Sequence, residues 1–402
     1  MKEIKDYIDD FYETDDLIRL AKNTPIFIEN DTIKSDLAYQ AVCNKILDLL
    51  QNSHLRDKYR IEIDVRCTNL IQKLFKTYVT NDTFIITSSH DHEATTDMLG
   101  NNKRYIINLF RLQDKQERIK IFGEIISAYK ESGCKNIFCI MVGTTPQSAV
   151  VIDQAFFVEL KHKLTNNSIS HLMFLDDCQG LLMIERNYEI FDGFLASGHV
   201  LSCLFPSVGL LFTKLPHQIG YINKQTLINV FDKLEIINKY KDKALGFNEV
   251  LSNYFESILK DTGFKKYKNE ALHQFSMALP DTTVSKKQDV DYLPYGIRFN
   301  PIDTRDNFVR IRYFEAIVLD SNFFVEGLNK LKKDLVHMQK RKEMQIEDLR
   351  YTNESRDKGK DLYLELDEMK LNSKFKGILT IQQLQTIREN MFRSSQSMIK
   401  IR

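Results

Sequence analysis

Polar side chains that could do chemistry follow four separate apolar runs of this 402-residue chain. The runs are short and rich in Val, Ile, Leu and Phe, which predicts buried β-strands. Hydroxyl groups and backbone N–H groups at strand ends could bind a phosphate, carboxylates could bind a cationic group, and histidines could transfer a proton. In chain order these residues are Ser88, Ser89, His90 and His92, then Thr144 and Thr145, then Asp176 and Asp177, then Ser197 and His199.

Segments with helical periodicity separate the apolar runs, and this alternation predicts a mostly parallel sheet covered on both faces. The expected strands are residues 83–89, 104–108, 136–145, 171–177, 193–198 and 208–214. Ligands bind beyond the carboxyl ends of the strands in such sheets. Chance could place polar groups at one or two of these strand ends, but four strand ends carry them. We therefore expect a binding site at that edge of the sheet.

The pattern along the chain predicts four regions and an α/β fold with a second, smaller domain. The regions are an N-terminal helical segment (1–64), a large α/β domain (65–224), a connecting helix with a smaller C-terminal α+β domain (225–350), and a charged linker with a final helix (351–402).

Composition excludes several classes of protein. The net charge is +1, which gives no reason to expect nucleic acid or an anionic membrane as partner. No apolar run approaches the length of a membrane span, and the acidic first residues do not form a signal peptide. The six cysteines include no CxxC pair, so we expect no metal site, no disulfide framework and a cytoplasmic setting.

Four of these segments, in this order, resemble the fold-type-I enzymes that use pyridoxal 5′-phosphate. The resemblance is strongest to the group II amino acid decarboxylases, histidine decarboxylase among them, and it covers about residues 65–214. The segments are TSSHDHEATTDML, VGTTPQSAVVID, FLDDCQG and SGHVLSCLFPSVGLLFTK. The resemblance implies an aspartate-aminotransferase-like large domain, a homodimer and a small amino-acid-like ligand.

The resemblance also implies roles for individual residues. His92 would stack on the cofactor ring, Asp177 would pair with the pyridine nitrogen, and further hydroxyl groups would line the cofactor. Those further residues are Ser88, Ser89, Thr144, Thr145 and Ser197. In the small domain the substrate carboxylate would be bound by Arg298, Arg310 and Arg312. Each also has a purely structural interpretation, as a helix cap, a turn or a surface ion pair.

The chain departs from this family at the position of its central residue. The family's lysine, which forms the Schiff base with the cofactor, is replaced by Val200 after Ser-Gly-His, and residues 164–213 contain no lysine. Lys214 follows an apolar strand and is expected at the opposite edge of the sheet. The sequence therefore predicts a degenerate relative that cannot form the Schiff base and acts as a non-catalytic binding or regulatory subunit. Pyridoxal phosphate, pyridoxamine phosphate or no cofactor at all remains open.

Two alternatives remain. The chain could be a lysine-independent cofactor enzyme, either a lyase or a pyridoxamine-phosphate-dependent dehydratase, with His199 or His92 as the catalytic base. One branch of the fold has a histidine in place of the lysine, and His199 is one residue from that position. The chain could instead be an ordinary nucleotide-binding α/β protein. It has neither a Gly-x-Gly-x-x-Gly nor a Gly-x4-Gly-Lys-Ser loop, which weakens that alternative.

Overall fold

The computed structural model describes most of the first 260 residues and selected parts of the remainder. The described residues are 1–21, 37–145, 150–201, 208–215, 224–259, 265–266, 274–280, 292, 295–301, 306–312, 316–317, 319–340, and 371, 373–375, 378–379, 383–384 and 387.

A seven-stranded sheet organises the first half of the chain, with strand order β1-β7-β6-β5-β4-β2-β3. Its strands are β1 (Arg60–Asp64), β2 (Thr83–Ser88), β3 (Arg104–Ile107), β4 (Asn136–Val142), β5 (Ser170–Asp176), β6 (Gly193–Ser197) and β7 (Gly209–Thr213). Strands β3, β2, β4, β5 and β6 are parallel, and β7 pairs antiparallel with both β6 and β1. The mostly parallel sheet expected from the apolar runs is confirmed.

Strand β1 lies within the range 1–64, which was expected to be helical. Its sequence RIEID alternates charged and apolar residues, yet Glu62 and Asp64 are buried along with Ile61 and Ile63. This strand forms one edge of the sheet against β7. The sheet therefore begins before residue 65.

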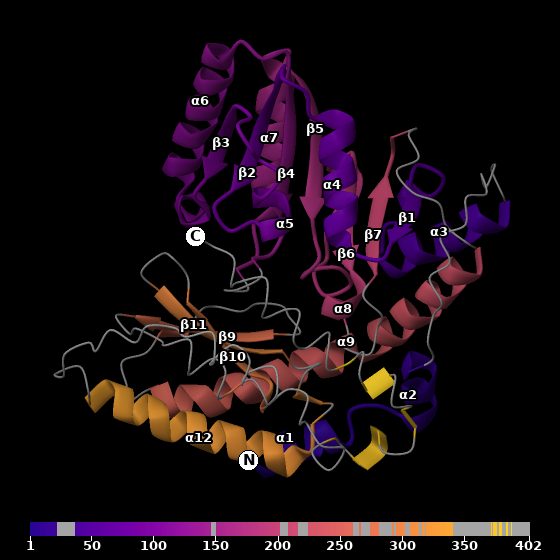
Figure 1. The fold of residues 1–402 in the computed structure, drawn as a ribbon, viewed down its shortest axis with the longest axis vertical. Helices are drawn as coiled ribbons and strands as arrows, with labels where there is room; N and C mark the ends of the chain where they lie inside the picture. Colours follow the sequence, from indigo (N-terminus) through magenta and orange to yellow (C-terminus); the bar gives the residue numbers. More distant parts are fainter. Residues whose placement is uncertain are drawn as a thin grey trace.

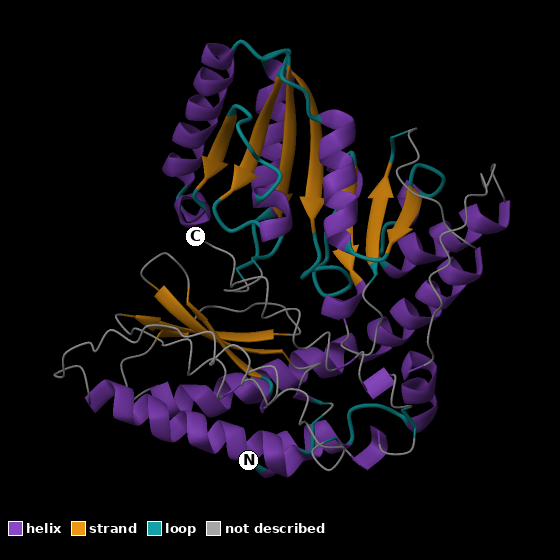
Figure 2. Cartoon of the chain, viewed as in Figure 1, coloured by secondary structure: helices purple, strands orange, loops and turns teal. Residues whose placement is uncertain are grey.

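Helices cover both faces of the sheet (Figures 1 and 2). On one face, α4 (Cys67–Tyr78) and α5 (Glu93–Thr96) contribute to an apolar cluster with residues of β2, β4, β5, β6 and β7. The opposite face packs in the main core with α6 (Lys115–Ser132) and α7 (Gln154–Asn166). Helix α6 begins at Asp114, which caps the N–H groups of Gln116 and Glu117, and ends at Gly133 with φ +68°.

Helical elements and a second sheet make up the remaining described residues. The helices are α1 (Lys2–Asp9), α2 (Thr14–Ala21), α3 (Leu37–Leu49), α9 (Lys224–Leu259) and α12 (Ser321–Lys340), with 3-10 turns at Ser53–Leu55, Leu109–Gln113, Tyr188–Ile190 and Ser373–Phe375. The second sheet is antiparallel, in the order β10-β11-β9-β8, with β8 (Lys265–Lys266), β9 (Gln274–Pro280), β10 (Ile297–Pro301) and β11 (Asp306–Arg312).

Figure 1 shows how the second sheet sits beside the first: the long helix α9 runs beneath both, and α12 and α1 lie along the outer side of the small sheet. Helix α3 and α2 also pack on α9. The long connecting helix and the strand-rich segment expected after residue 224 are thus present. The expected linker and C-terminal helix fall largely outside the described residues.

Helices that could cross a membrane are absent from the described ranges, because none is both long and apolar enough. Those ranges also contain no cluster of three or more His, Cys, Asp or Glu side chains placed to hold a metal ion.

Candidate functional site

The strand ends expected to converge do so, because β2, β4, β5 and β6 run parallel and end at one edge of the sheet, here named the carboxyl edge. Backbone hydrogen bonds join consecutive strand ends there. Gly143 donates to the carbonyl of Asp176 at 2.8 Å, and Asp177 donates to the carbonyl of Leu195 at 2.9 Å. The groups predicted to form a site are therefore neighbours, and their individual contacts decide what each can do.

The carboxylate of Asp91 accepts several hydrogen bonds at the end of β2. This buried group accepts hydrogen bonds from the N–H and the hydroxyl of Ser88, both at 2.7 Å, and from the N–H of Val142 at 2.8 Å. The hydroxyl of Thr87 is a further donor. Burial raises the pKa of Asp91, and these hydrogen bonds lower it in part. Ser88 thus helps to join the ends of β2 and β4, which the sequence did not predict.

The histidines after β2 lie at the entrance to α5. His92 is half-buried, and its Nδ1 accepts the N–H of Ala94 at 3.1 Å, so that the ring caps the helix. Ser89 is exposed, with its hydroxyl 2.8 Å from Nδ1 of His90. Burial lowers the pKa of His90. The structural role considered for His92, a helix cap, is the one this geometry provides.

The Gly-Thr-Thr segment after β4 pairs with the residues that precede α7. Thr144 and Val151 form an isolated antiparallel bridge, and the N–H of Thr145 donates to the carbonyl of Val150 at 3.0 Å. The hydroxyl of Thr145 accepts the N–H of Val150 at 2.9 Å. Both threonines are buried. The two threonines thus contact the backbone of Val150 and Val151, which gives both threonines a structural role.

Asp177, the expected partner of a pyridine nitrogen, is in a buried ion pair instead. Its Oδ1 lies 3.1 Å from Nε of Arg186, and its Oδ2 accepts the hydroxyl of Tyr188 at 2.5 Å. The Arg186 guanidinium also donates to the carbonyl of Gly143 at 2.6 Å and to the hydroxyl of Thr144 at 3.3 Å. Both charged side chains are almost completely buried, at 0% and 2% exposure. Arg186 lies in a loop without a recognisable motif, so the sequence offered no signal for it.

Asp176 is the second carboxylate, and it faces the other side of the sheet. It is two residues beyond Phe174, which packs with α4, and alternate strand residues share a face. Its Oδ1 accepts the N–H of Cys178 at 3.1 Å. Burial raises the pKa of Asp176 to about 6, which the Cys178 hydrogen bond opposes and the nearby carboxylates of Asp91 and Asp177 reinforce. Among the described residues no ion pair to Asp176 is found.

The N-terminus of α4 reaches the same edge as Asp176. Its N-cap residue, Arg66, is exposed, and the side chain of Arg66 makes no capping hydrogen bond to the helix. A Cβ atom at Gly209 would lie 2.4 Å from the backbone nitrogen of Cys67, so β7 packs directly against this helix end. An uncapped helix N-terminus favours anions, because its N–H groups lack partners and the helix dipole is positive there.

The position of the expected lysine lies in α8 (Gly198–Leu201), directly after β6. Gly198 donates to the carbonyl of Val208 at 2.8 Å, which closes the turn, and Ser197 and Val200 are buried. The side chain of His199 lies outside the described part of the structure. The end of β6 therefore carries a buried isopropyl group, that of Val200.

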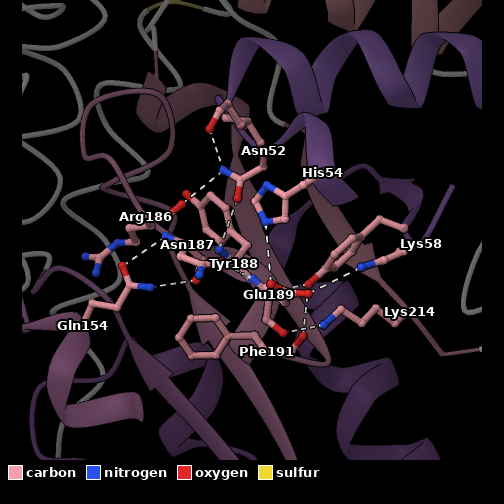
Figure 3. A network of polar contacts seen from close by, with 12 residues as sticks. Asn52, His54, Lys58, Gln154, Arg186, Asn187, Tyr188, Glu189, Phe191 and Lys214 are labelled. Carbon is pink, nitrogen blue, oxygen red and sulfur yellow. Dashed lines mark hydrogen bonds and ion pairs between the residues drawn. The ribbon is translucent and has the colours of Figure 1, made fainter. Parts of the chain in front are cut away.

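Lys214 lies at the opposite edge of the sheet, as predicted. The preceding residue, Thr213, pairs with Gly193, the first residue of β6. The ammonium group donates to the carbonyl of Glu189 at 2.6 Å and sits 5.3 Å from the centre of the Tyr59 ring. Burial lowers its pKa. Figure 3 shows Lys214 directed at the backbone of Glu189, beside Lys58.

Figure 3 also shows how the loop that carries Arg186 is held. The side-chain amide of Asn52 donates to the carbonyl of Arg186 at 3.1 Å and accepts the N–H of Tyr188 at 3.4 Å. Gln154 and Asn187 exchange two further hydrogen bonds, at 2.9 and 3.0 Å. The hydrogen bonds from Asn52 and Gln154 thus hold the loop in which Arg186 pairs with Asp177.

The three arginines expected to bind a substrate carboxylate all lie on strands of the second sheet. Arg298 in β10 is paired in register with Arg310 in β11. On the other side of β11, Arg310 pairs with Ser276 and Arg312 with Gln274 in β9. The side chains of the arginines are not among those described, so their role stays a prediction.

The strand order, the single antiparallel strand β7 and the second sheet define an aspartate-aminotransferase-like fold, that of the pyridoxal-phosphate-dependent enzymes of fold type I. The expected fold class is therefore confirmed. No protein-family model and no curated protein sequence matches the chain.

Solved structures with this fold resemble the chain at low sequence identity. A NifS-like protein from Rickettsia africae is 12% identical, covers 82% of this chain and 99% of its own, and has a TM-score of 0.59. A C-S lyase from Staphylococcus hominis, solved with bound pyridoxal phosphate, is 10% identical over 81% and 90% of the two chains, with a TM-score of 0.59. Mouse CSAD is 14% identical over 74% and 76%, with a TM-score of 0.53. These similarities establish the fold alone.

Proposed function

We propose that this protein is a degenerate relative of the pyridoxal-phosphate-dependent enzymes that serves as a non-catalytic binding or regulatory subunit. The observation that carries the proposal is Val200, a buried apolar side chain at the end of β6. A Schiff base requires an amine nucleophile. No lysine occurs between residues 164 and 213, and Lys214 contacts Glu189 at the opposite edge.

Two features of the carboxyl edge fit the polar ends of pyridoxal or pyridoxamine phosphate. The uncapped N-terminus of α4, with Arg66 beside it, would bind the phosphate. Asp176, which is buried and has a raised pKa, would accept a hydrogen bond from the pyridine nitrogen and keep it protonated. When bound, the cofactor ring supplies an electron-accepting group. We therefore transfer the nitrogen-partner role from Asp177, which is paired with Arg186, to Asp176.

These residues would bind a ligand without joining it covalently. Asp176 would orient the ring, and the helix N–H groups would hold its phosphate. Val200 and its buried neighbours would exclude water from the far side of the site. We also propose that the chain forms a homodimer, as expected from the resemblance, and sedimentation of the purified protein tests this.

Replacing Val200 by lysine tests the central proposal. Wild-type protein and the Val200→Lys variant would each be mixed with pyridoxal phosphate, reduced with borohydride, digested and analysed by mass spectrometry. We expect an adduct at residue 200 in the variant and none at a defined site in the wild type. A matched variant, Val208→Lys, introduces the same side chain at another buried position near β6 and is expected to give no specific adduct. One adduct per wild-type chain at a single native lysine would refute the proposal.

The lysine-independent enzyme is the second candidate. The raised pKa of Asp176 favours it, because such groups are common in catalytic sites. His92 and His199 would be its catalytic bases. Protein loaded with pyridoxamine phosphate would be incubated with a panel of amino acids, keto acids and sugars, and the products followed by mass spectrometry. Turnover that is lost in His92→Gln or His199→Gln would favour this candidate over the non-catalytic one.

A further inference from the structure

Two thiols meet at the carboxyl edge. The Sγ of Cys67 lies 3.4 Å from the Sγ of Cys178. Cys67 is the first residue of α4, and Cys178 is the second residue beyond the end of β5. Both are half-buried free cysteines, and 111 positions of sequence separate them. Because the pair has no sequence motif, only the fold brings the two sulfurs into contact.

The backbone on both sides holds this contact in place. Gly209 in β7 leaves no room for a side chain beside the nitrogen of Cys67, so that helix end cannot recede toward β7. The N–H of Cys178 donates to Asp176. A disulfide needs its sulfurs about 2.05 Å apart. The remaining approach is therefore on the order of 1 Å, which small side-chain rotations and backbone shifts can supply.

We propose that Cys67 and Cys178 form a reversible disulfide that joins the N-terminus of α4 to the end of β5. A low-molecular-weight disulfide is the oxidant: one thiolate attacks it and releases a thiol, and the second thiolate then attacks the mixed disulfide and releases another. Two protein thiols lose two electrons and two protons, and the oxidant is reduced to two thiols. One sulfur–sulfur bond forms in the protein as the oxidant's bond breaks.

The disulfide would join the two groups assigned to the ligand, the end of α4 and the loop bonded to Asp176. Its effect on binding therefore rests on the proposed function, whereas its formation does not. The resting state is the dithiol. Contact with Cys67, burial and the Asp176 carboxylate raise the pKa of Cys178. For Cys67, the Cys178 thiol lowers the pKa, but burial and Asp176 raise it by more. Exchange is thus slower than at an exposed thiol.

Redox titration of the full chain tests the proposal. Reduced protein would be equilibrated in buffers of increasing ratio of oxidised to reduced glutathione, alkylated, digested and analysed by mass spectrometry. We expect one linked peptide pair containing Cys67 and Cys178, with the loss of two hydrogen atoms, reversed by a reductant. Because the bond closes a loop of more than one hundred residues in a chain of 402, the thermal midpoint should rise by roughly 5 °C.

Variants identify the sulfurs. Cys67→Ser and Cys178→Ser should each abolish the linked pair and the rise in thermal midpoint. Cys134→Ser, at another half-buried cysteine, and Cys203→Ser should leave both unchanged. Absence of the linked pair in the wild type at any glutathione ratio, or pairing with another cysteine, would overturn the proposal.

Ligand binding separates this proposal from the proposed function. Retention of pyridoxamine phosphate by reduced and oxidised protein would be compared by equilibrium dialysis, and we expect at least a fivefold difference in affinity. A linked pair with no change in affinity would overturn control of the site but leave the disulfide established. If neither form retains the ligand, the assignment of the ligand fails while the disulfide stands on its own mass shift.

Discussion

Asp176 and Asp177 are adjacent carboxylates, and their replacement by asparagine should change stability in opposite directions. Burial raises the pKa of Asp176 from 3.8 to about 6. The folded protein thus holds this proton more tightly than the unfolded chain does. The resulting stabilisation is fully present below the unfolded value near pH 4 and is lost as the pH rises through about 6, a difference of about 3 kcal/mol.

Asp176→Asn removes the loss of stability at neutral pH, because an amide does not ionise. The amide oxygen can still accept the N–H of Cys178. At neutral pH we therefore expect the variant to be more stable than the wild type by up to about 3 kcal/mol, and at about pH 4 we expect no difference. Asp177→Asn leaves Arg186 buried without its counter-charge. That variant should be less stable at neutral pH by about 3–5 kcal/mol.

Urea unfolding followed by circular dichroism, from about pH 4 to about pH 7, measures both effects. Equal slopes of the unfolding free energy against urea concentration would show that the unfolded states of the variants are comparable. The informative quantity is the difference in unfolding free energy between the wild type and Asp176→Asn, because the other titrating groups contribute equally to both proteins. A difference that does not vary with pH would show that Asp176 titrates alike in the folded and the unfolded chain, and would refute the assigned pKa. Pyridoxamine phosphate should stabilise the wild type more than this variant if Asp176 binds its ring.

Two further substitutions, each with a control, test the packing around the Asp177 ion pair. Arg186→Met should lower the unfolding free energy by about 3–5 kcal/mol, because it leaves a buried carboxylate unpaired. Lys135→Met, which removes an exposed ion pair, is its control and should not change the urea midpoint. Gly180→Ala should cost about 1–3 kcal/mol, since its Cβ would lie 2.3 Å from Oδ1 of Asp177. Gly123→Ala, at an open and exposed position in α6, should instead stabilise by about 1 kcal/mol; an equal loss in both alanine variants would contradict the stated contacts.

In the seven-stranded sheet, the strands that the sequence predicted and the one that it missed differ in a physical respect. Continuous apolar runs such as those of β4 and β5 identify strands buried on both faces, and the predicted bounds of these strands lie within three residues of the observed ones. Strand β1 reads as RIEID, in which charged residues alternate with isoleucine. Only the packing of β1 against β7 and α4 makes Glu62 buried. A local pattern does not contain that long-range contact.

The choice of Asp176 or Asp177 as the partner of the ring nitrogen also depended on long-range contacts. In a run of two aspartates, spacing from another motif is uncertain by one residue, and one residue reverses the face of a strand. The deciding facts are the apolar neighbours of Phe174 on one side and Arg186 on the other. Arg186 is nine positions beyond Asp177 in a loop, so the pairing exists only after the loop has folded.

Retained polar residues at the carboxyl edge have structural explanations that do not require catalysis. His92 caps α5, Thr145 accepts the N–H of Val150, and Asp177 neutralises a buried arginine. Losing any of them would leave a buried donor, acceptor or charge unpaired, so a chain without activity would still retain them for stability. Asp176 differs, because its ionised form destabilises the folded protein at neutral pH. A group that costs stability needs another reason to be present, and a bound cation at that edge, such as a protonated ring nitrogen, would offset the cost.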